Sequence, residues 1–308
     1  MGTQSTSTPL AVGSGAFAAR LRALAEALRP GQWVKNGFVF APLIFGRELT
    51  NLHDVLRVAM TAAVFCALAS AAYLINDAFD VDEDRCHPVK RLRPLASARL
   101  SARLAIGTAV TLDSVALAVA WRLGPNLLLV TAIYAGLNLL YSGWLKRAML
   151  VDVFLIAAGF LLRVVAGGVA IHVEISSWLV VCTTLLALFL ALSKRRCELV
   201  LLGRNASAQR SSLAHYSPYF LDQLIVIVTS ATVLSYALYT LSPDVSARFP
   251  GKRLELTVPF VLFGVFRYLF LVHRQEQGDN PARTLFTDSV LLTVVLLWGL
   301  SVIAIIYL

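Results

Sequence analysis

Long apolar stretches recur along the chain and are separated by short polar segments. A helix that crosses a bilayer needs about 20 mostly apolar residues. Stretches of this kind are found at 33–46, 55–77, 101–121, 126–143, 150–172, 177–193, 223–242, 255–273 and 288–308, the first being the shortest. The pattern predicts an all-α integral membrane protein of about nine transmembrane helices.

The composition supports this interpretation, because 58% of the 308 residues are hydrophobic and only 15% are charged. Such a composition does not suit a water-soluble protein. Residues 1–16 are rich in Ser, Thr, Gly and Ala, and we expect them to form a disordered N-terminal tail. No linker interrupts the apolar stretches that follow, so residues 17–308 are expected to form a single transmembrane domain.

The net charge of +9 is unevenly distributed along the chain. Lys and Arg concentrate in the cytoplasmic segments of membrane proteins. With the N-terminus inside, 19 of these residues fall in cytoplasmic segments and six in outer ones. This predicts a multi-pass protein of the plasma membrane with an N-in/C-out orientation. Because topology explains the basic charge, we expect no nucleic-acid partner.

Carboxylates gather where the second apolar stretch ends. Asp77, Asp80 and Asp84 stand at i, i+3 and i+7, which places them on one face of a helix. Unpaired, they would repel one another, whereas Mg²⁺ prefers oxygen ligands of this kind. The spacing therefore predicts a magnesium site at the cytoplasmic mouth. The alternative is a solvated acidic loop balanced by nearby cations.

Basic residues continue the same loop. Arg85, Lys90 and Arg91 offer N–H donors that match phosphate oxygens. A metal beside such cations is typical of a site for a diphosphate. We therefore expect a diphosphate substrate to bind at this mouth.

The motif from Asn76 to Asp84 resembles the NDxxDxxxD motif of the UbiA superfamily of intramembrane prenyltransferases. The resemblance implies a UbiA-like fold of nine helices around a central cavity, with the motif holding Mg²⁺ on a diphosphate. It extends to the polar segments before the first stretch and after the fourth. The substrate-binding residues that it implies there and in the motif are Lys35, Asn76, Tyr141 and Lys146. The two lysines could instead snorkel to lipid headgroups.

The end of the sixth stretch departs from much of that family. Members that transfer a prenyl group to an aromatic ring carry a second aspartate-rich motif there, whereas this chain has Lys194-Arg195-Arg196-x-Glu198. Cations can bind phosphate oxygens directly, so we expect Lys194, Arg195 and Glu198 to serve the donor site. A positive-inside anchor is the alternative.

A buried arginine adds to this departure. Arg163 lies within the fifth stretch, where a charge needs a partner such as Asp152 or a bound phosphate. Together with the basic loop and the end of the sixth stretch, it resembles the decaprenyl-phosphate phosphoribosyltransferase branch of the family. We therefore expect Arg163 to bind substrate.

This branch implies a particular reaction. A 5-phosphoribosyl group passes from phosphoribosyl diphosphate to a polyprenyl, decaprenyl-like phosphate, and diphosphate is released, for synthesis of a cell-wall arabinan precursor. Mg²⁺ on Asp77, Asp80 and Asp84 would stabilise the leaving group. A phosphate monoester is already anionic at neutral pH, so the histidines need no catalytic role.

Two other functions stay open. One is UbiA-type transfer of a prenyl group from a prenyl diphosphate to an aromatic or other acceptor. The other is a membrane transporter, because Arg163, Arg267 and Asp113 lie within apolar stretches.

Overall fold

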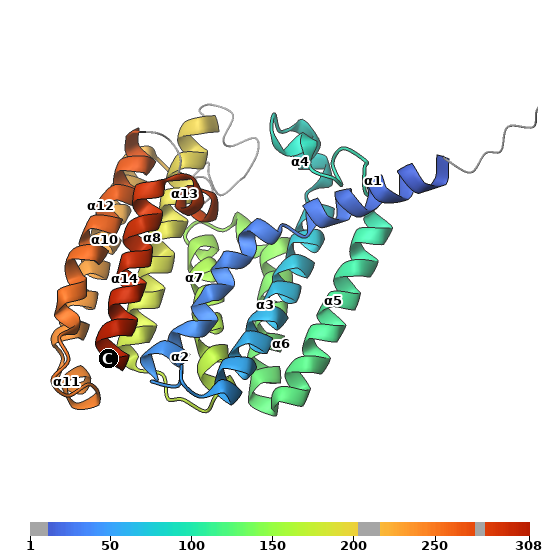
Figure 1. The fold of residues 1–308 in the computed structure, drawn as a ribbon. Coiled ribbons are helices and arrows are strands. Elements are labelled where there is room, and N and C mark those ends of the chain that lie inside the picture. Colours follow the sequence, from blue (N-terminus) through green and yellow to red (C-terminus); the bar gives the residue numbers. More distant parts are fainter. Residues whose placement is uncertain (1–11, 203–215, 275–280) are drawn as a thin grey trace, which may run out of the picture.

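The computed structural model describes residues 12–202, 216–274 and 281–308, and every regular element in those ranges is a helix (Figure 1). Eight helical segments there are long and apolar enough to cross a membrane. They comprise α3 (Leu52–Phe79), α5 (Ala102–Leu123), α6 (Pro125–Gly143), α7 (Val151–Ala170), α8 (Ser177–Leu202), α10 (Pro218–Leu241), η6 (Leu254–Thr257) with α12 (Val258–Arg274), and α14 (Ser289–Tyr307). The prediction of an all-α, multi-pass membrane protein is confirmed.

The segment expected to form the first membrane helix has a different structure. Pro30–Phe40 forms the 3₁₀ helix η1, which continues directly into the short helix α2 (Ala41–Phe45), so the helix predicted at 33–46 is present as two joined pieces instead of one regular α-helix. These two pieces still run the length of the bundle (Figure 1). A Cβ added at Gly167 of α7 would meet the carbonyl oxygen of Val39 at 2.0 Å. The backbone of η1 therefore lies directly on α7, which only glycine allows.

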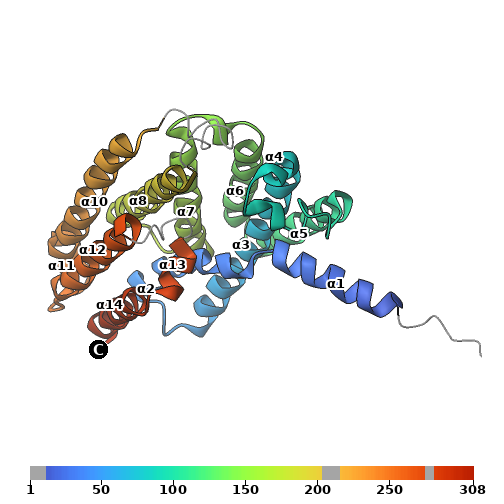
Figure 2. The ribbon, with the colours of Figure 1, turned by 90° about the horizontal axis from the view of Figure 1, so that it is seen from above.

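The membrane helices follow one another around the bundle from α3 to α14 (Figure 2). α3 packs on α5, α7 lies between α6 and α8, α8 packs on α10, and α12 on α14. η1 lies against both α3 and α7. A central cavity of about 1030 Å³ is lined by residues of η1, α3, α6, α7, α8, α12 and α14. The expected UbiA-like arrangement of helices around a cavity is thus present.

Short elements distinguish the two ends of the bundle. One end carries α1 (Val12–Ala27), α4 (Val81–Cys86) and α13 (Pro281–Thr287), whereas α11 (Pro243–Arg248) and the C-terminus lie at the other (Figure 1). The loops next to α4 and after α6 contain the 3₁₀ turns η2 (Lys90–Leu92) and η3 (Leu145–Arg147). Residues 1–11 of the expected tail lie outside the described residues. The orientation in the membrane stays a prediction.

Candidate functional site

The carboxylate motif lies where α3 meets α4. α3 ends at Phe79, Asp80 caps it, and α4 begins at Val81, so one continuous helix does not carry all three aspartates. The three aspartates therefore do not share one helical face as expected, because the helix is interrupted at Asp80. Asp84 belongs to the separate short helix α4. The three carboxylates consequently have different surroundings.

Asp77 is buried beneath two arginines. Its side chain accepts hydrogen bonds from Arg29 Nη2, at 2.5 and 2.8 Å to its two oxygens, and from Arg93 Nη1 at 3.2 Å. The Arg29 guanidinium also lies over the ring of Tyr73, 4.8 Å from its centroid. Asp77 does not line the cavity, and its observed contacts fix the two arginines at the cavity wall.

Asp80 and Asp84 do line the cavity. Lys146 Nζ donates to Asp80, whose other oxygen accepts from Asn76 Nδ2 at 2.9 Å. Arg93 Nη1 donates to Asp84 Oδ2 at 2.6 Å. Burial raises the pKa of Asp84, and the Arg93 guanidinium opposes that rise. Each carboxylate of the motif therefore faces at least one cation.

This arrangement corrects the expected three-carboxylate cluster. In the part of the chain that the structure describes, no three His, Cys, Asp or Glu side chains lie close enough to hold a metal ion. The physical reason is that Arg29 and Arg93 hold Asp77 on the protein side. Asp80 and Asp84 present only oxygen atoms to the cavity, which is the donor set that Mg²⁺ prefers. The chemistry of these two side chains would suit a magnesium ion.

The basic end of α8 contains a buried ion-pair network. Arg195 is 0% exposed; its Nε donates to Asp152 Oδ2 at 2.7 Å, its Nη1 to Glu198, and its Nη2 to the Tyr141 hydroxyl at 3.4 Å. Its side chain is therefore not placed to contact substrate, contrary to expectation. Lys194 lines the cavity instead, with its Nζ 3.7 Å from Glu198 Oε1.

Arg163 is held by neutral groups. Its Nε donates to Asn36 Oδ1, its Nη1 to the Gly159 carbonyl and its Nη2 to the Tyr134 hydroxyl, each at 2.7 Å. Of the two partners considered for Arg163, Asp152 and a bound phosphate, the first is excluded, because Asp152 pairs with Arg195 of α8. Arg163 thus ties η1, α6 and α7 together at the cavity wall.

His87 orders the loop after α4. Its Nδ1 accepts from the backbone N–H groups of Val89 at 3.1 Å and Lys90 at 3.2 Å. Burial, together with the nearby Lys90 and Arg93 cations, lowers the pKa of His87. A neutral imidazole whose Nδ1 accepts is the form that this turn requires.

Of the 14 residues expected at the site, ten line the cavity. They are Lys35, Asn76, Asp80, Asp84, Lys90, Tyr141, Lys146, Arg163, Lys194 and Glu198. Asp77 and Arg195 are buried behind the wall. Arg85 pairs with exposed Asp82 at 3.0 Å, and Arg91 is exposed. Contrary to expectation, neither arginine lines the cavity.

Sequence reasoning did not select the arginines that contact the motif. Arg29 and Arg93 line the cavity as well as binding Asp77, and Tyr134 and Asn138 line it from α6. Arg93 could have been selected as part of the basic loop. Nothing in the spacing links Arg29 to an aspartate 48 residues later.

Comparisons with known proteins identify the family to which this chain is similar. The UbiA prenyltransferase family matches residues 39–290. The chain is 37% identical over 289 residues to the decaprenyl-phosphate phosphoribosyltransferase of Corynebacterium glutamicum, a match that covers 92% of this chain and 86% of the relative. It is 36% identical over 278 residues to the protein of the same name from Mycobacterium tuberculosis, with 89% and 90% covered.

A solved structure shows the same fold. The UbiA homolog from Archaeoglobus fulgidus bound to GPP and Mg²⁺ matches with a TM-score of 0.69 and 18% identity, over 92% of this chain and 99% of that one. At that identity the likeness concerns the fold alone. The family match covers residues 39–290, and the Corynebacterium glutamicum relative is 37% identical over 92% of this chain. This chain therefore belongs to the UbiA prenyltransferase family.

Proposed function

We propose that this protein transfers a 5-phosphoribosyl group from phosphoribosyl diphosphate to a polyprenyl, decaprenyl-like phosphate in a Mg²⁺-dependent reaction, for synthesis of a cell-wall arabinan precursor. The observation that carries the proposal is the basic end of α8, where Lys194 lines the same cavity as Asp80 and Asp84. A donor with a 5-phosphate as well as a diphosphate needs additional cations. The relatives named decaprenyl-phosphate phosphoribosyltransferase, about 36% identical, support this choice of donor.

The residues have distinct roles in this reaction. Asp80 and Asp84 would hold Mg²⁺, which when bound neutralises charge on the departing diphosphate. Lys146 and Lys90, which line the cavity near them, supply cationic contacts to the diphosphate oxygens. An oxygen of the lipid phosphate forms the new bond to ribose C1 while the bond from C1 to the diphosphate oxygen breaks, and diphosphate leaves with the electron pair. Arg93 holds Asp84 in place.

A transfer assay in detergent tests the proposal. Purified protein receives Mg²⁺, phosphoribosyl diphosphate labelled in the ribose and a polyprenyl phosphate. We expect label in the lipid fraction and an equal amount of diphosphate. Transfer from a labelled prenyl diphosphate to an aromatic acceptor, with no ribose label in lipid, would favour the other UbiA chemistry instead. A transporter would consume no donor without a sealed vesicle.

We also propose that the mouth of the cavity faces the cytoplasm. The support is the excess of Lys and Arg at the end that carries α4. Cys86, at the end of α4, is exposed and can report on this. An impermeant thiol reagent should leave Cys86 unlabelled in intact cells and label it after permeabilisation. Labelling in intact cells would reverse the orientation.

A further inference from the structure

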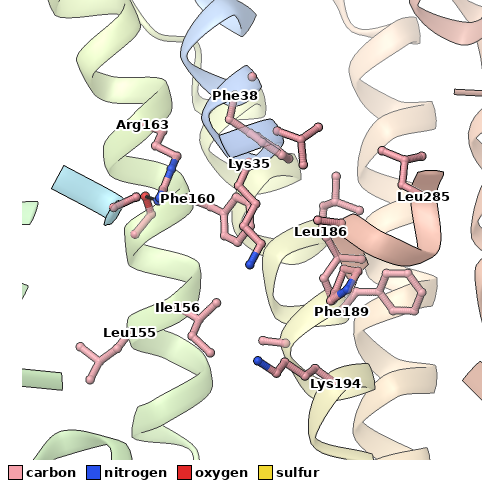
Figure 3. A pocket seen from close by; sticks show the side chains of 18 of the residues that line it. Lys35, Phe38, Leu155, Ile156, Phe160, Arg163, Leu186, Phe189, Lys194 and Leu285 are labelled. Carbon is pink, nitrogen blue, oxygen red and sulfur yellow. Dashed lines mark hydrogen bonds between the residues drawn. The ribbon is translucent and has the colours of Figure 1, made fainter. Parts of the chain in front are cut away.

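The helix α1 carries exposed apolar side chains outside the membrane-spanning helices. In the central cavity, apolar side chains such as Phe160, Leu186 and Phe189 line the space between helices (Figure 3). On α1, by contrast, Phe17 is 64% exposed and Leu21 is 50% exposed. Neither of these two residues lines the cavity, so the substrate site does not account for them.

These two side chains form the outer half of an apolar stripe. The stripe repeats at i, i+4, i+7 and i+11, on one face of the helix, and consists of Phe17, Leu21, Leu24 and Leu28. Leu24 and Leu28 pack against a buried cluster formed by α3, α5 and the loop before α5. The inner half of the stripe is thus covered by protein, whereas the outer half is exposed.

α1 lies at the depth where the membrane-spanning part of α5 begins. It leaves the bundle beside α5 and points away from it, across the direction of the membrane helices (Figure 1 and Figure 2). Ala23 of α1 belongs to the same buried cluster as Ala105 in the first turn of α5. The neighbouring Leu104 and Ile106 of α5 are 45% and 48% exposed, in a helix long and apolar enough to span a membrane. Lipid that surrounds this end of α5 therefore reaches α1.

One ion pair fixes the rotation of α1 about its axis. Both carboxylate oxygens of Glu26 accept from Arg99, at 2.7 Å from Nη1 and 3.0 Å from Nη2, and Arg99 lies in the polar loop before α5. Glu26 lies about 180° around the helix from Phe17. The apolar stripe therefore faces away from the polar loop, toward the membrane. Arg20 and Arg22, both exposed, lie on either side of the stripe.

From this we propose that α1 is a membrane-surface anchor whose partner is an anionic lipid surface. Phe17 and Leu21 insert among the lipids next to α5, and Arg20 and Arg22 bind headgroup phosphates. A helix with this division of side chains lies in the plane of the interface. The bilayer is the occupant because the covered half of the stripe continues directly into it. Its anionic headgroups also match the two exposed arginines.

Fluorescence quenching in vesicles tests the anchor. In a Cys86→Ala parent, a bimane label is placed at Phe17→Cys or at Ala19→Cys. Ala19 is the matched control, because it is exposed and lies about 200° around the helix from position 17. The parent with no added cysteine gives the signal of the remaining thiols. Lipids with a nitroxide on the acyl chain should quench the label at position 17 severalfold more than the label at position 19, and aqueous iodide should do the reverse. Equal nitroxide quenching at the two positions would overturn the anchor.

The charge of the vesicle tests the kind of lipid. In a Leu21→Ser background, which weakens the apolar contact, adding phosphatidylglycerol to phosphatidylcholine should restore nitroxide quenching at position 17. Each arginine near an anionic surface should raise the ratio of docked to free α1 by about fivefold. Arg20→Gln combined with Arg22→Gln should therefore abolish the response to phosphatidylglycerol. Equal quenching with and without phosphatidylglycerol would overturn the anionic partner.

Thermal unfolding in detergent identifies other occupants of the stripe. The melting temperature of each variant should equal that of the parent, because the replaced side chains are exposed. A large fall in Leu21→Ser would show that protein covers the stripe, and iodide protection of position 17 that rises with protein concentration would show that a second copy does. Either result would overturn the lipid partner. None of these measurements uses turnover, so a failure of the proposed transfer reaction would leave the anchor standing.

Discussion

Two charged regions of the cavity wall use their ion pairs in opposite ways. At the junction of α3 and α4, carboxylates are bound by cations, and Asp80 and Asp84 still face the cavity. At the end of α8, a cation is bound by carboxylates, because Arg195 is buried between Asp152 and Glu198. The first region presents carboxylates to the cavity, whereas the second uses its arginine to hold the helix end together.

This difference shows that residue type alone does not assign a role. Arg195 and Lys194 are neighbours in a basic run, yet one is fully buried and the other lines the cavity. Among the aspartates, Asp77 is buried behind two arginines while Asp80 lines the cavity. Variants at these positions can break or sharpen the comparison.

The largest effect is expected at the metal-facing carboxylates. Asp80→Ala should lower kcat by on the order of 10³-fold, about 4 kcal/mol, because a ligand of the ion that stabilises the leaving group is lost. Turnover at saturating substrates checks this, with Asp82→Ala as the control, since the Asp82 side chain is 94% exposed. Wild-type turnover by Asp80→Ala, or by the native protein in EDTA, would remove the metal assignment.

Arg195→Ala should act on stability. Removing the guanidinium leaves Asp152 and Glu198 without their buried partner, a change that costs about 3–5 kcal/mol. The melting temperature in detergent should fall sharply, whereas Arg103→Ala, an exposed residue at the start of α5, should leave it unchanged. A stable Arg195→Ala protein with a raised donor KM would show instead that Arg195 binds substrate.

Lys194→Ala should act on binding. Its side chain lines the cavity and is 37% exposed, so we expect a loss of about 1–2 kcal/mol in donor binding, roughly tenfold in donor KM. The KM of the lipid and the melting temperature should change little. If the residue is only a positive-inside anchor, insertion into the membrane will change and the donor KM will not.

The smallest effect is expected at Arg85 and Arg91, which lie outside the cavity. An exposed ion pair contributes only about 0–1 kcal/mol to the free energy of unfolding. Arg85→Ala and Arg91→Ala should therefore each keep donor KM and kcat within about twofold of wild type. A tenfold rise in donor KM would mean that the loop after α4 moves onto the substrate.

Much of the fold could be predicted because apolar length is a local property of the chain. The eight helical segments were found this way, and the i, i+3, i+7 spacing located the carboxylates. The break at Asp80 and the 3₁₀ helix η1 depend on packing against distant segments, as at Gly167. The pairing of Arg29 with Asp77 joins residues 48 positions apart, and no pattern within either segment encodes it.

The central claim is that this cavity binds phosphoribosyl diphosphate through a magnesium ion and cations, and direct titration tests it. Wild-type protein in detergent is titrated with phosphoribosyl diphosphate in Mg²⁺ and in EDTA, and geranyl diphosphate is used as a competitor. The account predicts Mg²⁺-dependent binding of phosphoribosyl diphosphate, weakened in Asp80→Ala and in Lys194→Ala. Equal binding in EDTA, or geranyl diphosphate binding tightly while phosphoribosyl diphosphate does not, would contradict it.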